Sequence, residues 1–461
     1  MNRARELDAA LRADLSALLG ERVTTARGVR EHHGKDESYY PYAAPDAVVF
    51  PRSTEEVRDV VNICRRYHTP MIAYGVGTSL EGHILANSGG VCIDTSQMNR
   101  VIAVHAEDMD ATVQAGVTRK QLNEEIRHAG LMFPVDPGAD ATLGGMAATR
   151  ASGTNAVRYG TMRENVLSLT VVTADGRIIR TSRRPRKSAA GYDLTRLFVG
   201  SEGTLGIITE VTVRLYAVPE AMSAAVCSFK DMKGAVDTVI QTLQHGIPIA
   251  RSEALCATTM RAINAYNKTA YKEQPTLWIE FHGTEASVTE QAGLVQAIAT
   301  ENGGEDFEWA TRPEDRNRLW AARHQAYFAG LQLRPGTRAV STDVCVPVSR
   351  LTECIVETMR DIERASMPIP LFGHVGDGNF HCMVLIRPDS AADLAEAKAF
   401  NARLVDRALA LEGTCTGEHG IGAGKIGSLR KEHGEAVDLM VAIKRTLDPE
   451  NLMNPGKVVP L

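Results

Sequence analysis

Long apolar runs are missing from this sequence of 461 residues. No run approaches the roughly 20 residues needed to cross a bilayer, so a membrane span is not expected. Basic blocks are missing as well, because 51 Lys and Arg residues stand against 56 Asp and Glu residues without a long cluster of either sign. A chain of this kind cannot track a phosphate backbone, which excludes nucleic acid as an expected partner.

Paired cysteines are also missing: the eight cysteines are scattered singly and no CxxC occurs. Neither a disulfide framework nor a thiolate zinc site is therefore indicated. The first 20 residues have no apolar core like that of a secretory signal, and Glu6, Asp8 and Asp14 argue against an acid-poor transit peptide. This stretch is predicted to be a surface helix, and a cytoplasmic location is expected, with peripheral association at the inner membrane left open.

The remaining composition is that of a soluble globular protein, with 44% hydrophobic and 23% charged residues. The length favours two or three domains. A short strand at 47–50, a helix that starts after Ser53 and a second strand at 71–74 are predicted at the start of the first half. From about 90 to 218 the pattern changes to short β-rich runs with turn signals, and a domain boundary is expected near residue 220.

The second half alternates longer helical patterns with strands. Helices are predicted at 231–245, 286–302 and 350–366, with strands at 276–283 and within 371–386. That order predicts an antiparallel sheet with two or three helices packed on one face. The fold class is therefore expected to be α+β.

Residues 70–82, PMIAYGVGTSLEG, place two glycines directly after a predicted strand. Gly75 and Gly77, followed by Thr78 and Ser79, allow backbone amides to turn inward and form a nest for a pyrophosphate. Ordinary turns also contain glycine, so this loop alone leaves both interpretations open. The spacing does not match GxGxxG and the Walker lysine is missing, which disfavours NAD and ATP.

Two further segments are rich in glycine and small polar residues: 134–160 and 197–211. Such segments suit a long cofactor in an extended groove, since bulky side chains would block its approach. Together the three segments resemble the FAD-binding domain of the vanillyl-alcohol oxidase (PCMH) type, most closely its D-lactate dehydrogenase and glycolate oxidase branch. The resemblance runs from about residue 41 to the end of the chain.

This resemblance implies a helical segment at 1–40, a PCMH-type FAD-binding domain at 41–219, an α+β cap domain at 220–435 and a tail at 436–461 that packs back on the FAD domain. It also implies that FAD is contacted by nine residues: Gly75, Val76, Gly77, Thr78, Ser79, Asp136, Gly145, Ser152 and Ile207. Some relatives attach FAD through a histidine in the first loop. Thr78 stands at about that place here, so non-covalent FAD is expected.

A second group of residues indicates a metal. His374 and His381 flank the helix-breaking Gly376-Asp377-Gly378, and the apolar flanks favour a hairpin that brings the two imidazoles together. Glu418, far along the chain, is a third candidate ligand, and two histidines with one carboxylate leave positions open as in a catalytic site. A single histidine beside a turn is more often a structural hydrogen-bonding group. The pair GHVGDGNFH and GEHGIG resembles the metal site of the same branch, which implies that these three residues bind Zn²⁺ or Mn²⁺ and that His419 is the base.

Arg323, on a predicted helix, resembles the arginine that grips the C1 carboxylate in related 2-hydroxy-acid dehydrogenases, although most helix arginines are simply solvated. The 2-hydroxyglutarate branch adds a threonine and a lysine at places that Tyr327 and Ser341 occupy here. Burying a second carboxylate without the lysine would be costly. The resemblance therefore implies a small D-2-hydroxy monocarboxylate, such as D-lactate, as the substrate.

The leading hypothesis is an FAD-dependent, metal-assisted D-lactate dehydrogenase that passes electrons to a quinone, a cytochrome or an electron-transfer protein. A glycolate oxidase FAD subunit is the alternative with the same chemistry. A cofactor-free metallohydrolase and a non-catalytic flavin-binding subunit are the alternatives from other classes. The joint occurrence of three flavin segments and a complete metal and base set disfavours both.

Overall fold

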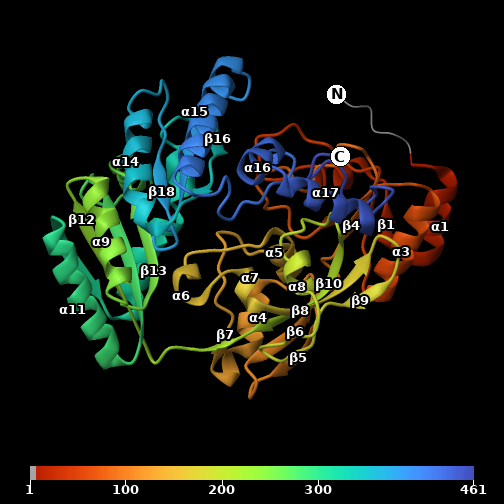
Figure 1. Ribbon diagram of the computed structural model, residues 1–461, viewed down its shortest axis with the longest axis horizontal. Coiled ribbons are helices and arrows are strands. Elements are labelled where there is room, and N and C mark those ends of the chain that lie inside the picture. The colour runs from red at the N-terminus through yellow and green to blue at the C-terminus, as the bar shows by residue number, and fades with distance from the viewer. Residues whose placement is uncertain (1–6) are drawn as a thin grey trace. The chain divides into compact units, whose positions relative to one another are not determined.

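The computed structural model describes residues 7–461, so Glu6 of the N-terminal prediction lies outside the described residues. The chain forms two compact units (Figure 1). Of the described residues, the first contains 7–152, 160–218 and 418–461, and the second contains 153–159 and 219–417. The chain thus passes between units after Ser152, Tyr159, Val218 and Gly417, and the sequence analysis places boundaries at 219 and 435.

The first unit begins with a four-stranded sheet. Its strands, in spatial order, are β1 (Val23–Thr24), β2 (Ala47–Val49), β4 (Val91–Asp94) and β3 (Met71–Tyr74). The last three are parallel, an arrangement that requires crossovers, and α3 (Thr54–Arg66) provides the one between β2 and β3. Ser53 begins this helix as expected, since its hydroxyl accepts the N–H of Glu56 at 3.2 Å. The predicted strand, helix and strand are therefore confirmed.

The predicted N-terminal surface helix is α1 (Ala9–Leu19), which buries one face. Leu11, Leu15 and Leu19 share an apolar cluster with Val57 and Val60 of α3. Their spacing of four residues places the three leucines on one side of the helix. Packing against α3 therefore ties α1 to the first sheet.

A five-stranded antiparallel sheet forms the other half of this unit. Its order is β5 (Val101–His105), β6 (Asp110–Gln114), β10 (Gly206–Arg214), β8 (Val166–Thr173) and β9 (Ile178–Arg180), and β7 (Leu131–Met132) pairs separately with β11 (Tyr216–Ala217). Short helices accompany it: α2 (Arg27–His32), α4 (Arg119–Ile126), α5 (Leu143–Thr149), α7 (Met162–Asn165) and α8 (Leu194–Phe198). This is the β-rich region that the sequence predicts.

The C-terminal segment carries α16 (Ile426–His433) and α17 (Ala436–Leu447) and joins the first sheet. The N–H of Met71 on β3 donates to the carbonyl of Leu452 at 2.8 Å. Lys444 donates to the carbonyl of Thr204 at 2.8 Å, and Lys457 donates to that of Leu85 at the same distance. Buried lysines that satisfy backbone carbonyls hold this segment in place.

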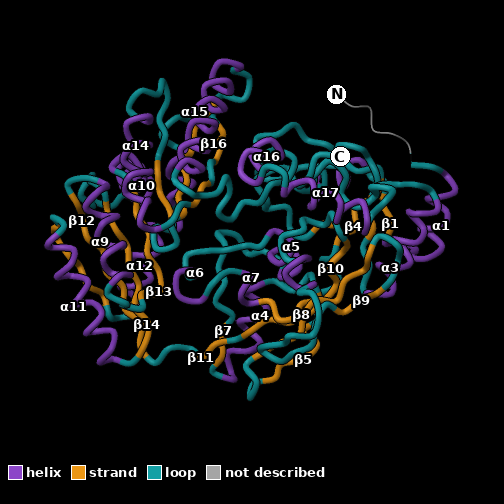
Figure 2. The backbone as a smooth tube through the Cα atoms, viewed as in Figure 1, coloured by secondary structure: helices purple, strands orange, loops and turns teal. Residues whose placement is uncertain are grey.

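The second unit is built on one eight-stranded sheet. Its order is β15 (Gly304–Ala310), β12 (Ala221–Phe229), β14 (Thr276–Gly283), β13 (Ile249–Leu255), β18 (Leu371–Gly373), β19 (Asn379–Ile386) and β16 (Arg338–Ser341), with β17 (Val344–Cys345) also paired to β19. Every pair in it is antiparallel. Figure 2 shows these strands in orange, accompanied by purple helices.

Helices cover both faces of this sheet, whereas the sequence analysis expects them on one. The first set is α9 (Met232–Gln244), α11 (Glu285–Glu301) and α14 (Leu351–Ile362), and the second is α10 (Ala257–Asn267), α12 (Pro313–His324) and α13 (Ala326–Leu331). Trp278 of β14 packs into the apolar cluster of the second set, while its neighbours Leu277 and Ile279 are equally buried on the other face. The face of β14 that carries Trp278 also carries Glu280 and His282, so the sequence of this strand alternates as in a strand with one exposed face.

The remaining helices of the second unit are α15 (Ala391–Ala410) and the short α6 (Ala156–Tyr159), which contacts β13. The predicted hairpin at 371–386 is confirmed, because β18 and β19 are antiparallel with Phe372 opposite His381. No helix in the described part of the chain combines the length and apolar character that a bilayer span requires.

Candidate functional site

The three glycine-rich segments meet in the first unit, beside the end of β3. A Cβ placed on Gly75 would lie 2.5 Å from Oγ1 of Thr142 and 3.9 Å from Cα of Gly145. A Cβ placed on Gly203 would lie 3.7 Å from Cβ of Ala73. Segments that are about 70 and 130 residues apart along the sequence are therefore neighbours, as an extended cofactor groove requires.

Gly77 has a backbone conformation that favours glycine, with φ at +71°. A Cβ at this position would lie 2.6 Å from the hydroxyl of Tyr74. Val76 and Thr78 are exposed, and Ser79 donates to Asp36 at 3.3 Å. A tight glycine turn of this kind, with small or exposed side chains around it, fits the cradle predicted for a pyrophosphate.

The other residues predicted to contact FAD differ in what they can offer. Gly145 lies in the first turn of α5 and Ser152 is buried beyond its end, while Asp136 is half-buried. Ile207 is 1% exposed and packs in the apolar cluster that contains Met71. The side chain of Ile207 is therefore part of the core of the first unit.

Sequence reasoning missed Glu202, which lies in the third glycine-rich segment. Its two carboxylate oxygens accept the N–H groups of Ile421 and Gly422, each at 2.8 Å, and His83 lies 3.2 Å away. Burial raises the pKa of Glu202, but the His83 imidazole and the two amides outweigh it and bring the pKa below its ordinary value. The signal was a charged residue inside a run of small ones, GSEGTLG.

Glu81 is a second buried carboxylate near the same loop. Its Oε1 lies 3.1 Å from Nζ of Lys425 and 3.9 Å from Nδ1 of His419. The predicted base His419 is thus in a charged surrounding inside the first unit. Its side chain is 9% exposed.

The hairpin of β18 and β19 brings the two predicted histidine ligands together. The rings of His374 and His381 are 5.5 Å apart and nearly perpendicular. Glu418, the third predicted ligand, and the predicted base His419 belong to the first unit. Imidazole and carboxylate donors suit Zn²⁺ or Mn²⁺.

Each histidine has a partner behind it in the second unit. Nδ1 of His381 lies 3.1 Å from the carbonyl of Thr342 and 3.7 Å from the carboxylate of Asp343. Asp343 is fully buried and accepts hydrogen bonds at 2.7 Å from both Asn379 and Thr416. Such supporting hydrogen bonds fix the tautomer and orientation of a ligating ring.

His374 and the predicted substrate residue Arg323 share one partner, Glu253 of β13. Nδ1 of His374 lies 2.5 Å from Oε1, while Nε and Nη2 of Arg323 donate to Oε2 at 3.0 and 2.5 Å. Burial raises the pKa of this carboxyl, but the His374 imidazole and the Arg323 guanidinium outweigh it and bring the pKa to about 2. Sequence reasoning missed Glu253 because a single acid inside a strand carries no local signal.

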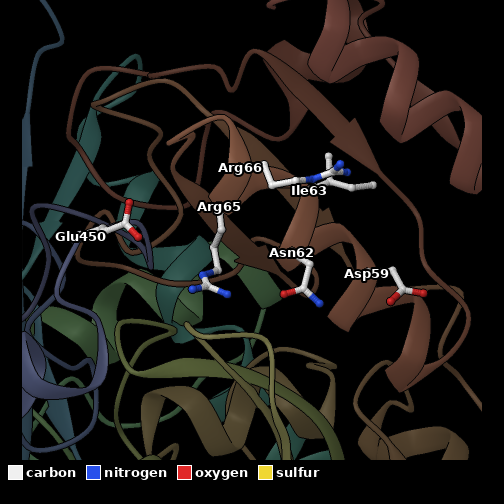
Figure 3. Close-up of a pocket in the computed structure, with 6 residues that line it drawn as sticks. All are labelled: Asp59, Asn62, Ile63, Arg65, Arg66 and Glu450. Atoms are coloured by element: carbon white, nitrogen blue, oxygen red, sulfur yellow. The ribbon is translucent and has the colours of Figure 1, made fainter.

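A different pocket lies over α3 in the first unit (Figure 3), lined by Asp59, Asn62, Ile63, Arg65, Arg66 and Glu450. None of these residues belongs to the glycine-rich segments or to the histidine hairpin. Arg65 donates to the carbonyl of Asp175 at 2.9 Å, which ties this wall to a neighbouring turn. The chemistry of the predicted site therefore lies elsewhere.

Two family profiles match the chain in two successive regions. Residues 45–182 match the FAD binding domain, and residues 218–458 match the C-terminal domain of FAD linked oxidases. A solved p-cresol methylhydroxylase, with a TM-score of 0.81 and 20% identity, covers 97% of this chain and 96% of its own. This structural similarity shows the fold alone. Together with the match to the FAD binding domain it confirms the expected α+β class with a PCMH-type FAD-binding domain.

Three relatives cover almost the whole chain. A probable mitochondrial D-lactate dehydrogenase of Danio rerio is 56% identical over 96% of this chain and 90% of its own. A mitochondrial D-lactate dehydrogenase [cytochrome] of Arabidopsis thaliana is 48% identical over 97% of this chain and 80% of its own. The glycolate oxidase subunit GlcD of Bacillus subtilis is 36% identical over 90% of this chain and 89% of its own.

The expected cytoplasmic location is contradicted, because the relatives from Danio rerio, Arabidopsis thaliana and Saccharomyces cerevisiae are all named mitochondrial. The expectation rested on single cysteines and on the acidic residues near the N-terminus. Unpaired cysteines indicate a reducing compartment, but they do not distinguish one reducing compartment from another.

Proposed function

The chain belongs to the family of FAD-linked oxidases, and on that premise we propose that it is an FAD-dependent D-lactate dehydrogenase. The observation that carries this proposal is its 56% and 48% identity, over nearly its full length, to two proteins named D-lactate dehydrogenase. The reaction is oxidation of D-lactate to the 2-oxo acid. Two electrons and the C2 hydrogen leave as a hydride, and the hydroxyl hydrogen leaves as a proton.

FAD is the cofactor, and we infer that it is held non-covalently by the loop Gly75–Ser79 and the segments around Gly145 and Ser152. When bound it supplies the hydride acceptor. The tight turn at Gly77 and the close approach of Gly75 to Thr142 support this placement, since both leave room only for backbone at the loop. Thr78 offers no nucleophilic ring for a covalent link.

His374, His381 and Glu418 are proposed to hold one Zn²⁺ or Mn²⁺ ion. A divalent ion at this place would supply Lewis acidity toward the substrate hydroxyl and carboxylate. The closeness of the two imidazole rings supports the assignment, and so do the hydrogen-bonding partners behind both rings.

Two residues of the chain are proposed to act on the substrate directly. Arg323 binds the C1 carboxylate, because a guanidinium pairs with a carboxylate through two parallel hydrogen bonds. His419 accepts the hydroxyl proton on a ring nitrogen, since a neutral imidazole is available near pH 7. Its nearness to Glu81 favours this role, because the carboxylate stabilises the imidazolium that forms.

We propose that the substrate has a short, uncharged side chain, because Ser341 stands where related enzymes for dicarboxylates have a lysine. Ser341 lies opposite Met383, and opposed residues of an antiparallel pair face the same side of a sheet. Met383 belongs to the cluster that packs against α12, the helix that carries Arg323. A serine here provides no cation for a second carboxylate, which favours lactate over a 2-hydroxy dicarboxylate.

A cytochrome is the electron acceptor that we favour among the three acceptor classes. The Arabidopsis thaliana and Saccharomyces cerevisiae relatives carry the word cytochrome in their names. Reduction of cytochrome c by the D-lactate-reduced enzyme, followed by the change in the absorbance of its haem, tests this choice.

The function is tested by mixing the yellow, FAD-loaded protein anaerobically with D-lactate, L-lactate, glycolate and D-2-hydroxyglutarate. D-lactate should bleach the flavin fastest, and L-lactate should leave it oxidised. Faster bleaching by glycolate would favour a glycolate oxidase subunit. A colourless protein, or a flavin that no hydroxy acid bleaches, would contradict the proposal.

The metal is tested separately by elemental analysis. About one Zn or Mn per chain is expected in the wild-type protein, and His374→Ala and Glu418→Ala should each lose most of it. His433→Ala is a matched control, since this exposed histidine lies at the end of α16. Native metal content in both ligand variants would contradict the site.

A further inference from the structure

Glu253 is a fully buried carboxylate whose two oxygens serve two different functional groups. Oε1 lies 2.5 Å from Nδ1 of His374, and Oε2 accepts Nε and Nη2 of Arg323. All three residues belong to the second unit, on β13, after β18 and on α12. The residue stands between the proposed metal ligand and the proposed substrate arginine.

For His374 this contact decides which nitrogen can bind a metal. An ionised carboxylate only accepts hydrogen bonds, so Nδ1 of His374 carries the hydrogen. The lone pair of the neutral ring is then on Nε2, the nitrogen farther from Glu253. The contact also fixes the plane of the ring, as partners behind metal-bound histidines do.

For Arg323 the contact decides which edge of the guanidinium can meet a substrate. Glu253 takes the edge formed by Nε and Nη2, and the guanidinium carbon lies 5.0 Å from the ring centre of Phe372. The plane of the group is thereby fixed. The other edge, formed by Nη1 and Nη2, remains for a bidentate carboxylate contact.

We propose that Glu253 is a positioning residue that couples metal binding at His374 to substrate binding at Arg323. This inference rests on the proposed roles of those two residues. One carboxylate sets the tautomer and orientation of the metal ligand and the direction of the guanidinium edge. Its loss should therefore weaken metal binding and D-lactate binding together.

A purely structural role would be that Glu253 neutralises buried cations. The neighbouring strand β14 offers a matched comparison for that role. Glu280 is 3% exposed, lies 2.7 Å from Nε2 of His282 and lies 3.5 Å from Nε of Arg251. This is the same set of carboxylate, imidazole and guanidinium, and none of its members belongs to the metal-capable groups.

Glu253→Gln removes one acceptor while keeping the size of the side chain. An amide presents one oxygen and one NH₂, so it cannot accept from both His374 and Arg323. Glu253→Asp keeps the charge, which favours folding, but withdraws the carboxylate by one methylene, so that it cannot reach both partners. Glu280→Gln is the control for loss of a buried acid in the same sheet.

The FAD-loaded variants are equilibrated with graded Mn²⁺ or Zn²⁺, and bound metal is counted. For Glu253→Gln the metal Kd should rise by about 10- to 100-fold. At saturating metal the KM for D-lactate should rise on the order of 10-fold, the cost of a weakened charge-assisted contact. Glu253→Asp should show both effects, and Glu280→Gln should keep native metal Kd and KM even where it lowers the unfolding midpoint.

Native metal Kd and native KM in both Glu253 variants would overturn the coupling. The coupling is also overturned if Glu253→Gln keeps its metal Kd and KM and only its unfolding midpoint falls, by as much as that of Glu280→Gln. His374→Ala and Arg323→Ala, measured alongside, separate this failure from that of the proposed function. If His374→Ala binds metal normally, or if Arg323→Ala keeps its KM, the proposed site itself is wrong and the coupling is lost with it.

Discussion

Glu202 accepts the backbone N–H of Gly422 at 2.8 Å, across 220 residues of sequence. Its second oxygen accepts the N–H of Ile421. Gly420 and Gly422 both have positive φ, so this part of the chain has little conformational preference of its own. The carboxylate therefore holds in place the loop that begins with Glu418 and His419.

Glu202→Ala should destabilise the first unit. The substitution leaves two buried amides without their acceptor and His83 without its counter-charge, which together cost about 2–4 kcal/mol. Urea unfolding should show this as a lower midpoint, and FAD should shift the midpoint back. Glu124→Ala, at an exposed position of α4, is the control and should change stability by less than about 0.5 kcal/mol. Equal midpoints for the two variants would show that the clamp contributes nothing.

Gly77→Val should abolish FAD retention. Its φ of +71° is unfavourable for a β-branched residue, and the new Cβ would lie 2.6 Å from the hydroxyl of Tyr74. The loop must then change its backbone where the pyrophosphate is proposed to bind. Desalted protein should show an FAD-to-protein absorbance ratio near zero.

Gly28→Val, on α2 and outside the three glycine-rich segments, is the control, since Gly28 has ordinary φ and no atom within 4 Å of its Cβ. It should keep its flavin. Acid precipitation of the wild-type protein should release all the FAD into the supernatant. Flavin that stays with the pellet would contradict the non-covalent assignment.

Local patterns predicted much of the fold. The cap of α3 at Ser53, the strand at 71–74 and the hairpin of β18 and β19 depend on neighbouring residues, which a sequence displays directly. The helices on both faces of the large sheet were not predicted. In β14 the polar residues Glu280 and His282 alternate with Ile279 and Phe281, as in a half-exposed strand, and only tertiary packing reveals that both faces are covered.

The partners behind the candidate site could not be predicted for a related reason. Glu253 and His374 are 121 residues apart, and Glu202 and Ile421 are 219 residues apart. The resemblance of short motifs identified the candidate metal ligands and the candidate base. It did not identify the buried acids that orient them, because a single acid in a strand or turn has no distinctive spacing.

Lys457 should contribute stability that rises with pH in the alkaline range. Burial lowers its pKa from 10.5 to about 8, although Glu202 and Asp36 oppose the shift. Below about pH 8 the lysine is protonated in both states. Between about 8 and 10.5 this lysine binds more protons in the unfolded chain, so its contribution to the free energy of unfolding increases with pH, by up to about 3 kcal/mol in total. Buried thiols such as Cys64 and Cys382, whose pKa is raised by burial, contribute the opposite slope because they ionise first in the unfolded chain.

Urea titrations at about pH 7.5, 8.5 and 9.5 measure this slope below the range where tyrosines ionise. Lys457→Met should make this slope more negative than in the wild-type protein, because the rising contribution of the lysine is removed while the opposite contribution of the buried thiols remains. Lys431→Met, at an exposed position of α16, is the control and should keep the wild-type slope. A slope that Lys457→Met leaves unchanged would assign the proton uptake to another group.

His419→Ala tests the proposed proton acceptor. A general base contributes about 10²- to 10⁴-fold, so flavin reduction by saturating D-lactate should slow by that order while FAD and metal remain bound. The expectation is motivated by the position of His419 next to the proposed ligand Glu418 and by Glu81, whose carboxylate lies 3.9 Å from Nδ1 of His419.

The rival role of His419 is structural: a buried imidazole that stabilises the loop by hydrogen bonding. That role predicts a lower unfolding temperature with a nearly native rate of reduction. Rapid mixing under anaerobic conditions measures the rate directly, with His433→Ala as the control for loss of an exposed imidazole. Because flavin reduction precedes electron transfer to the acceptor, a slow step later in turnover cannot mask the effect. A rate within a few-fold of wild type would remove His419 from the mechanism and leave Asp343 or a water molecule to be tested as the acceptor.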